Sequence, residues 1–371
     1  MLGKKAIVVS SGIPTYSMPE NDLPHHVKLH LNENMFASAL RARGDDVGTI
    51  ENSGLTNLHT YPIRGTSKLQ AAIAEHVMCT PENVLITNGS AELLRLLFIK
   101  LISAGDSALL PSPSWSFFTS IAQLSGARAC YYQLAKTPDR YEYDLGDFRR
   151  GLVEHAPKLA VVCSPNNPTG NAVDAGDLLE IVDEFPDVVF LVDQAYHGFS
   201  EEQRGAEVIV SAAITRTNLI VSRTFSKFLA LANLRIGFLL GNADFVEYIK
   251  PLATIFGIST LSQELAIKRM QDHQLQGDLR SEYKVVRDYV NRKLLNTDGL
   301  YPYKTQANFI LVRCGPQWAD LAKNLMNAGF MVKSENISES EAHLRITLAD
   351  MNTMISLIQT IESIGKLLHE N

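Results

Sequence analysis

The amino-acid sequence predicts an α/β protein in which helices cover a mostly parallel sheet, followed by a smaller α+β domain. Two observations predict this class. Short runs of β-branched residues and leucine alternate with amphipathic helical stretches through the middle of the chain. After about Gly241, a long helical pattern and an isolated strand replace that alternation.

The expected strands of the sheet are apolar on both faces, as burial between two layers of helices requires. They lie at 83–87, 107–110, 158–163, 188–193, 218–222 and 235–240. Amphipathic helices are expected between them, for example over 91–102 and 177–185. The smaller domain is expected to contain a helical region over 259–295, a strand over 308–312, and then helix, strand and helix.

These patterns divide the chain of 371 residues into three expected parts. Residues 1–45 hold turn formers and no long periodic element, so we expect them to pack on the smaller domain. Residues 46–250 are expected to form the large domain and residues 251–371 the smaller C-terminal domain.

Composition narrows the classes of function. The 40 acidic and 34 basic residues are spread along the chain with a net charge of -6, so neither a nucleic acid nor a membrane is an expected partner. The cysteines form no CxxC pair, and no metal site or disulfide is expected of them. The sequence has no signal-peptide pattern and no apolar run as long as a membrane span, so we expect a cytoplasmic protein.

The most informative motif is Val221-Ser-Arg-Thr-Phe-Ser-Lys-Phe228, directly after an expected strand. Lys227 could form an imine there, while the hydroxyls of Thr224 and Ser226 and the guanidinium of Arg235 hold a phosphate. Taken alone, the motif is also compatible with a surface cluster of serine and lysine after a strand.

A second motif, Asn88-Gly-Ser-Ala-Glu92, joins a strand to a helix. Gly89 permits a tight turn, and the free N–H groups at the helix start can bind an anion. An ordinary strand-to-helix turn explains the same residues.

Two further motifs follow the next expected strands. In Ser164-Pro-Asn-Asn-Pro-Thr-Gly170, prolines and a glycine define an irregular loop that can aim two amides at a ligand. In Asp193-Gln-Ala-Tyr196, an aspartate ends an apolar strand. A buried carboxylate needs a partner, and a protonated ring nitrogen would suit it, although a helix cap or a salt-bridged core aspartate is the alternative.

Taken together in chain order, these motifs resemble those of fold-type I pyridoxal 5′-phosphate (PLP) enzymes of aminotransferase class I/II. Within that class the sequence is most similar to histidinol-phosphate aminotransferases, through Leu31-Asn-Glu-Asn34, the pair Tyr61-Pro62 and the SPNNPTG loop. The resemblance covers essentially the whole chain. It implies a mostly parallel seven-stranded sheet sandwiched by helices, with a smaller α+β domain.

The resemblance also implies roles for individual residues in binding PLP. Lys227 would carry PLP as a Schiff base and then move a proton between the substrate and the cofactor. Asp193 would pair with the pyridinium nitrogen, and Asn167 and Tyr196 would hydrogen-bond the phenolic oxygen. Phe118 would stack on the ring, with Trp115 as a competitor for that role. The expected phosphate-binding set is Gly89, Ser90, Ala91, Thr224, Ser226 and Arg235.

For the substrate, the resemblance implies that Arg345 in Leu-Arg-Ile-Thr-Leu would form a bidentate pair of hydrogen bonds with the α-carboxylate. Asn34 and Asn167 would line the substrate pocket. Lys333 stands where the family has an arginine for the substrate phosphate, and it lacks the bidentate fork. Tyr61 would reach the cofactor phosphate of a neighbouring subunit, which implies a homodimer with shared sites.

The sequence departs from the histidinol-phosphate aminotransferase pattern at several places. Met35 replaces a proline, Ile63-Arg-Gly-Thr66 replaces an Asp-Pro-Gln-like run, and Ala349 replaces a glycine. These changes leave the cofactor residues in place and bear instead on whether the substrate carries a phosphate.

The expected activity is therefore transfer of an amino group between an amino acid and a 2-oxo acid. The donor would be histidinol phosphate or a related, perhaps aromatic, amino acid. The alternative is a PLP-dependent decarboxylase resembling threonine-phosphate decarboxylases. A PLP-binding domain of a transcription regulator is a third hypothesis, and the first ~40 residues show no helix-turn-helix pattern that would support it.

Overall fold

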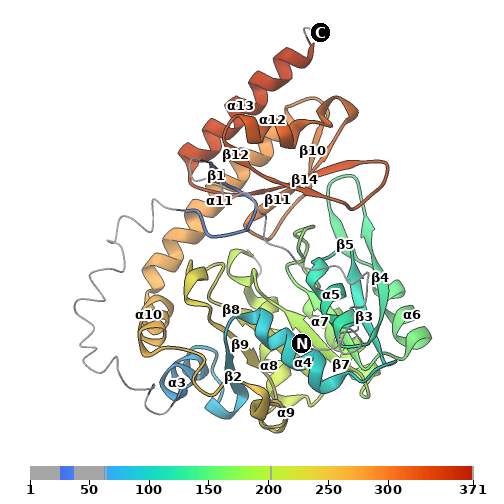
Figure 1. Cartoon of the computed structure of the whole chain (residues 1–371), viewed down its shortest axis with the longest axis vertical. Helices are drawn as coiled ribbons and strands as arrows, with labels where there is room; N and C mark the ends of the chain where they lie inside the picture. The colour runs from blue at the N-terminus through green and yellow to red at the C-terminus, as the bar shows by residue number, and fades with distance from the viewer. Residues whose placement is uncertain (1–25, 37–61, 63–64, 201–202, 370–371) are drawn as a thin grey trace, which may run out of the picture.

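The computed structural model describes residues 26–36, 62, 65–200 and 203–369. These residues form a large part around one sheet and a smaller part that extends to the C-terminal helix (Figure 1).

The large part is built on an eight-stranded sheet with the order β2-β9-β8-β7-β6-β3-β4-β5. Its strands are β2 (Val84–Thr87), β3 (Ser107–Ser112), β4 (Arg128–Lys136), β5 (Tyr141–Tyr143), β6 (Leu159–Cys163), β7 (Val189–Asp193), β8 (Leu219–Thr224) and β9 (Gly237–Leu240). The run from β8 through β7, β6 and β3 to β4 is parallel, and only the pairings of β9 and β5 are antiparallel. The expected mostly parallel α/β sheet is confirmed, with the three-residue strand β5 as one strand more than the seven expected.

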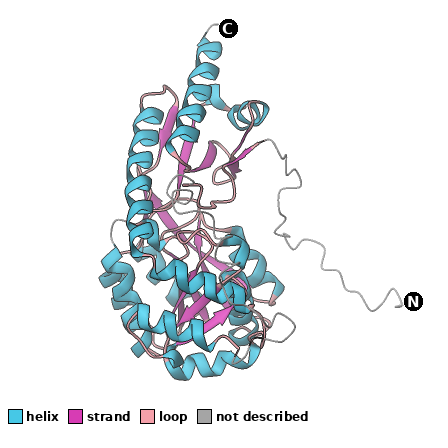
Figure 2. Cartoon of the chain, turned by 90° about the vertical axis from the view of Figure 1, so that its left-hand side faces the viewer, coloured by secondary structure: helices cyan, strands magenta, loops and turns pink. Residues whose placement is uncertain are grey.

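Helices cover both faces of this sheet, because alternate side chains of each strand enter different apolar clusters. Val162 and Val192 point into one cluster, while Val161 and Leu191 point into the other. The first cluster is covered by α3 (Ser67–His76), α6 (Leu145–His155), α7 (Ala175–Glu184) and α8 (Gln203–Thr215). The second is covered by α4 (Ser90–Leu101), α5 (Ser116–Leu124) and α9 (Ala243–Ile249). Figure 2 shows the helices around the strands.

The smaller part contains an antiparallel sheet in the order β10-β11-β14-β13 and its own apolar cluster. The strands are β10 (Leu300–Pro302), β11 (Phe309–Cys314), β13 (Lys333–Glu335) and β14 (Ala342–Thr347). The helices are α11 (His273–Leu295), α12 (Leu321–Asn327) and α13 (Met351–His369). Of the helices in the described ranges, none has both the length and the hydropathy to cross a membrane.

The N-terminal segment 26–36 packs on this smaller part. Its strand β1 (Val27–Lys28) pairs in parallel with β12 (Phe330–Met331). Leu29 and Phe36 are buried in the apolar cluster of the smaller part. This packing supports the proposed role of residues 1–45, whose other positions lie outside the described residues.

The helical region expected over 259–295 is divided at Asp272 into α10 (Thr260–Gln271) and α11. The Asp272 carboxylate accepts a hydrogen bond from the N–H of Leu275 at 3.0 Å and so caps α11. Ala266 and Met270 of α10 lie in an apolar cluster of the large sheet. The domain division remains a proposal, and this packing favours a boundary near Asp272 over one at residue 250.

Candidate active site

The predicted site residues of the large part gather at one edge of its sheet. Strands β6, β7 and β8 are parallel, and β2 runs in the same direction because β2 and β8 are both antiparallel to β9. The carboxyl ends of these strands therefore place Asp193, at the end of β7, beside the loops that carry Gly89, Asn167 and Lys227. Ligands of α/β sheets bind at such an edge.

Asp193 is the last residue of β7 and only 2% exposed. Its Oδ1 accepts hydrogen bonds from the Ser222 hydroxyl at 2.7 Å and from the Ala195 N–H at 3.2 Å. Burial raises the pKa of Asp193 to about 6, against the lowering effects of these two bonds and of Lys227. A carboxylate held in this way would be stabilised by a cationic ligand.

Lys227 follows β8 and is partly buried. Its Nζ donates a hydrogen bond to the carbonyl oxygen of Leu31 at 2.9 Å. Burial and, to a smaller extent, the nearby Arg345 lower the pKa of Lys227 to about 8, while Glu33 acts to raise it. Asp193 also raises the pKa of Lys227, and Lys227 lowers the pKa of Asp193. The predicted lysine and aspartate therefore lie close enough to interact electrostatically.

Tyr196 lies beside Lys227, whose Nζ is 5.8 Å from the centroid of the tyrosine ring. The Tyr196 hydroxyl accepts a hydrogen bond from Asn32 Nδ2 at 3.1 Å, and its ring packs edge-on against Phe309. Burial raises the pKa of Tyr196, so its phenol keeps its proton and remains a donor.

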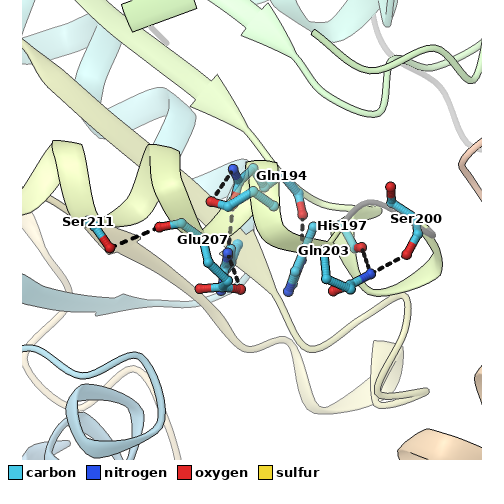
Figure 3. Close-up of polar contacts among 8 residues, drawn as sticks. Gln194, His197, Ser200, Gln203, Glu207 and Ser211 are labelled. Carbon is cyan, nitrogen blue, oxygen red and sulfur yellow. Dashed lines mark hydrogen bonds and ion pairs between the residues drawn. The ribbon is translucent and has the colours of Figure 1, made fainter. Parts of the chain in front are cut away.

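A polar network holds the turn that presents Tyr196. His197 Nδ1 and the carbonyl oxygen of Gln194 lie 2.9 Å apart, and Gln203 donates to the His197 carbonyl at 2.7 Å. The Gln194 side chain accepts from the buried Arg223, which also pairs with Glu207 of α8 at 3.0 Å. Figure 3 shows this network between the end of β7 and α8. These hydrogen bonds fix the backbone conformation of the residues that follow Asp193.

The predicted anion-binding turn lies at the start of α4. Gly89 has φ 78°, a left-handed conformation that favours glycine, and the first helical residues are Ser90 and Ala91. A Cβ on Gly89 would come within 2.6 Å of Arg235 Nη2, so the absent side chain lets the guanidinium lie against the turn. The N–H groups of a helix start and an arginine together form an anion-binding site.

Two hydroxyl groups extend this site. Thr224 Oγ1 and Ser226 Oγ lie 3.0 Å apart, and Arg235 Nη1 is 3.4 Å from Ser226 Oγ. On neighbouring β9, a Cβ at Gly237 would come within 2.3 Å of the Ser90 nitrogen, so a second glycine permits this close packing. The residues predicted to bind the phosphate, at positions 89–91, 224, 226 and 235, are therefore brought together.

Arg345 lies on β14 and is 5% exposed. Its Nη1 donates to Asn167 Oδ1 at 2.5 Å and its Nη2 to the carbonyl oxygen of His30 at 2.7 Å. Asn167 thereby connects the SPNNPTG loop of the large part to the arginine of the smaller part. These bonds orient the guanidinium, and its Nε makes no hydrogen bond with a described residue.

Glu335 was not predicted as a site residue, yet its Oε1 lies 3.0 Å from Arg345 Nη1. Lys333 faces Arg345 directly across the pair of β13 and β14. The sequence signal for Glu335 is its position two residues after Lys333, which puts both side chains on one face of a strand.

Asn32 is the second residue that sequence reasoning missed. It bonds to Tyr196, and Thr347 exchanges two hydrogen bonds of 3.1 Å with its backbone and its side chain. Asn34, which was predicted for the substrate pocket, donates its side-chain N–H to the carbonyl oxygen of Phe228 at 2.8 Å. The LNEN motif thus ties the N-terminal segment to the residue after Lys227.

The two aromatic candidates for stacking differ in burial. Phe118 is 1% exposed inside an apolar cluster, so neither face of its ring is open. Trp115 is partly buried at the start of α5, with its ring edge-on to Phe118 at 5.6 Å. The remaining prediction, Tyr61, lies outside the described residues.

The chemistry of these groups fits a phosphorylated aldehyde with a basic ring. An amine with a lowered pKa can attack an aldehyde, and a buried carboxylate can hold a ring nitrogen in its protonated form. The turn at Gly89 with Arg235 can hold a phosphate. PLP has all three of these features.

Comparisons with known proteins agree with this chemistry. The family model for aminotransferase class I and II matches residues 11–359. The histidinol-phosphate aminotransferase of Caldanaerobacter subterraneus subsp. tengcongensis is 28% identical over 350 residues, covering 92% of this chain and 94% of that protein.

Two solved structures share the fold. One is the histidinol-phosphate aminotransferase from Sinorhizobium meliloti in complex with PLP, with a TM-score of 0.81, 21% identity and coverage of 92% of this chain and 91% of that chain. The other is the L-threonine-O-3-phosphate decarboxylase from Porphyromonas gingivalis, with a TM-score of 0.74, 21% identity and coverage of 92% and 99%. At these identities the likeness concerns the fold alone.

Proposed function

The chain belongs to the class I and II aminotransferases, and on that premise we propose that its amino donor is histidinol phosphate or an aromatic amino acid of similar shape. The protein is a PLP-dependent aminotransferase and moves an amino group between an amino acid and a 2-oxo acid. The donor and the roles of individual residues are what the proposal adds.

When bound, PLP supplies an aldehyde carbon that bonds to amines and a ring that accepts the electron pair left on the substrate α-carbon. In our proposal, Ser90, Ala91, Thr224, Ser226 and Arg235 hold its phosphate. The geometry around Gly89 supports this assignment, because the helix start and the guanidinium lie together without an intervening side chain.

Lys227 would hold the cofactor covalently through Nζ, and its free amine would move the proton at the substrate α-carbon. The lowered pKa of about 8 supports both tasks. At pH 7 about a tenth of Nζ is unprotonated and can act as nucleophile or base, far more than for a lysine with the ordinary pKa of about 10.4.

Asp193 keeps the ring nitrogen protonated by pairing its carboxylate with the N–H of the ring. Tyr196 donates its phenol proton to the phenolic oxygen of the cofactor, while its own oxygen accepts from Asn32. Asn167 accepts from Arg345 through Oδ1, which leaves the Nδ2 donor to turn toward the same phenolic oxygen. We propose Trp115 as the stacking ring, because Phe118 has no open face.

The observation that carries the donor proposal is Arg345. A buried guanidinium, oriented by Asn167 and His30 and close enough to lower the pKa of Lys227, provides a site for the donor's anionic group next to the reacting amine. Histidinol phosphate is the first candidate because the relatives with that activity match over nearly the whole chain.

A panel of single-turnover reactions without an acceptor tests this proposal. Histidinol phosphate, histidine, phenylalanine, tyrosine, alanine and glutamate are each mixed with the PLP enzyme, and loss of the visible cofactor band and formation of oxo product are followed. We expect stoichiometric conversion that is fastest with histidinol phosphate or an aromatic donor. If alanine or glutamate reacts fastest, the proposed donor is wrong, and release of CO₂ without oxo product would indicate the decarboxylase.

We also propose a homodimer in which Tyr61 reaches the cofactor of the other subunit, and a cytoplasmic location. The dimer is supported by the resemblance of the Tyr61-Pro62 pair and by the prevalence of two-fold oligomers. Light scattering of the PLP enzyme measures the oligomeric state. Mixing Lys227→Ala and Tyr61→Phe subunits then tests whether an active site draws on both chains.

A further inference from the structure

Glu335 lies against the arginine proposed to bind the donor's anionic group. Its Oε1 is 3.0 Å from Arg345 Nη1, and both side chains are largely buried. The contact is electrostatic, because Glu335 Oε1 makes no hydrogen bond of acceptable geometry. The buried Nε of Arg345 also has no hydrogen-bond partner among the described residues. The guanidinium therefore still has a donor to offer to a ligand.

The strand register brings one more charge to this place. Lys333 is directly opposite Arg345 across the antiparallel pair of β13 and β14, and Glu335 is opposite His343. Directly opposed residues project from the same face of a sheet, as do residues two apart on one strand. Burial lowers the pKa of His343, so this imidazole is neutral. Arg313 of β11 also faces His343, but its Nη1 is paired with Glu341 Oε1 at 3.7 Å. The remaining charges on this face are the two cations Lys333 and Arg345 and the anion Glu335.

The sum of these charges is about one positive charge, since the carboxylate of Glu335 offsets one of the two cations. A carboxylate with one negative charge matches that sum. A phosphate monoester with nearly two negative charges does not, and it would also approach Glu335 at short range in a partly buried place where screening is weak.

We propose that Glu335 is a specificity-determining residue that favours donors with a carboxylate over donors with a phosphate monoester at the Arg345 site. The inference rests on the proposed function and selects between the two classes of donor named there. Without the charge of Glu335, Lys333 and Arg345 together would suit a phosphate dianion.

Histidine and histidinol phosphate are a matched pair of donors for the test. They share the imidazole side chain and the amine, and differ in carrying a carboxylate or a phosphate monoester. The ratio of kcat/KM for histidinol phosphate to that for histidine is measured in the parent enzyme and three variants. Glu335→Gln removes the anion, Lys333→Met removes a cation, and Glu339→Gln is the control, because Glu339 is exposed on the same segment.

We expect Glu335→Gln to raise this ratio about tenfold or more, Lys333→Met to lower it, and Glu339→Gln to leave it unchanged. If Glu335→Gln changes both donors by the same factor, Glu335 only orients Arg345 and the proposal fails. A change of the ratio by less than about threefold overturns it as well. Cofactor content and melting temperature of each variant establish that it is folded.

A binding measurement separates this inference from the proposed function. Inorganic phosphate is titrated into the PLP enzyme, with the visible cofactor band as the signal, and its affinity is compared in the parent enzyme, Glu335→Gln and Glu339→Gln. We expect about tenfold tighter binding in Glu335→Gln only. If neither donor is turned over, the donor proposal is wrong, while the phosphate titration still decides the role of Glu335. An unchanged phosphate affinity in Glu335→Gln would overturn that role.

Discussion

Ser222 donates a hydrogen bond from its hydroxyl to Asp193 Oδ1 over 2.7 Å, where β8 and β7 end side by side in the sheet. The serine lowers the pKa of a carboxyl group whose burial raises it. In this buried position the ionised carboxylate of Asp193 is therefore stable only when a cation lies next to it.

Asp193→Asn is expected to retain PLP but to lose activity by a factor of about 10²–10³ or more, because the ring nitrogen loses the charge partner that keeps it protonated. The measurement is the single-turnover rate of the PLP enzyme with its best donor. Ser222→Ala keeps the carboxylate and serves as the control, with an expected loss of less than about tenfold from one hydrogen bond. A nearly fully active Asp193→Asn would refute the role of Asp193.

The same variant is expected to stabilise the cofactor-free protein. Because the folded-state pKa of Asp193 is raised to about 6, ionising it in the folded state costs free energy, and stability from this group falls as pH rises from about 4 through 6. Asparagine has no such cost, so Asp193→Asn should add up to about 3 kcal/mol to the free energy of unfolding near pH 8. The gain should vanish near pH 4. Urea unfolding at both pH values measures it, and a gain that is equal at both would contradict the assignment.

Lys227 is expected to be the residue that bonds to PLP. Borohydride treatment of the enzyme followed by peptide mass spectrometry should find the cofactor on Lys227, and Lys227→Ala should lose essentially all turnover. Because the pKa of Lys227 is about 8, the unprotonated amine increases about tenfold from pH 6 to pH 7 and then levels off above pH 8. The rate at which cofactor-free enzyme combines with PLP should follow this curve. A label on another lysine would overturn the assignment.

The buried strands of the sheet could be predicted from the sequence because burial on both faces leaves a continuous apolar run. β7 has the sequence Val189-Phe-Leu-Val-Asp193 and is buried along nearly its whole length. β4, by contrast, alternates between exposed and buried residues from Arg128 to Lys136. Its polar positions interrupt the apolar run, so the sequence does not identify β4 as a buried strand.

That the residues proposed to bind the cofactor lie close together also follows from the sequence. Asp193 ends a strand, Asn167 and Lys227 come shortly after strands, and parallel strands end at one edge of a sheet. Asn32 and Glu335 could not be predicted from the sequence as residues of the site. Asn32 meets Tyr196 across a separation of 164 residues, and Glu335 reaches Arg345 only through the pairing of the three-residue strand β13 with β14. Contacts of this kind depend on tertiary packing and have no local pattern.

Gly89→Ala is expected to weaken PLP binding, because its Cβ would come within 2.6 Å of Arg235 Nη2 and push the guanidinium away from the phosphate. The matched control is Gly105→Ala. Gly105 also has a positive φ, 92°, but a Cβ there meets nothing within 4 Å. Both variants should lose about 1–2 kcal/mol of stability from backbone strain. Only Gly89→Ala should lose PLP affinity, about tenfold or more by equilibrium titration, and an equal loss in both would remove Arg235 from the explanation.

Arg345→Lys is expected to raise KM for the donor about 10- to 100-fold while changing kcat by a small factor, because the anionic group is bound both before and during the reaction. A lysine has one ammonium group, and it cannot hold Asn167, the His30 carbonyl and a donor anion in the planar arrangement that the guanidinium provides. Arg313→Lys is the control. Arg313 lies on the neighbouring strand β11, and its Cζ is 4.0 Å from the centroid of the Tyr301 ring. Steady-state kinetics with the best donor measure both variants. If Arg345→Lys lowered kcat and left KM unchanged, the arginine would act on the reacting atoms and not on the bound anion, and the donor's anionic group would have to lie elsewhere.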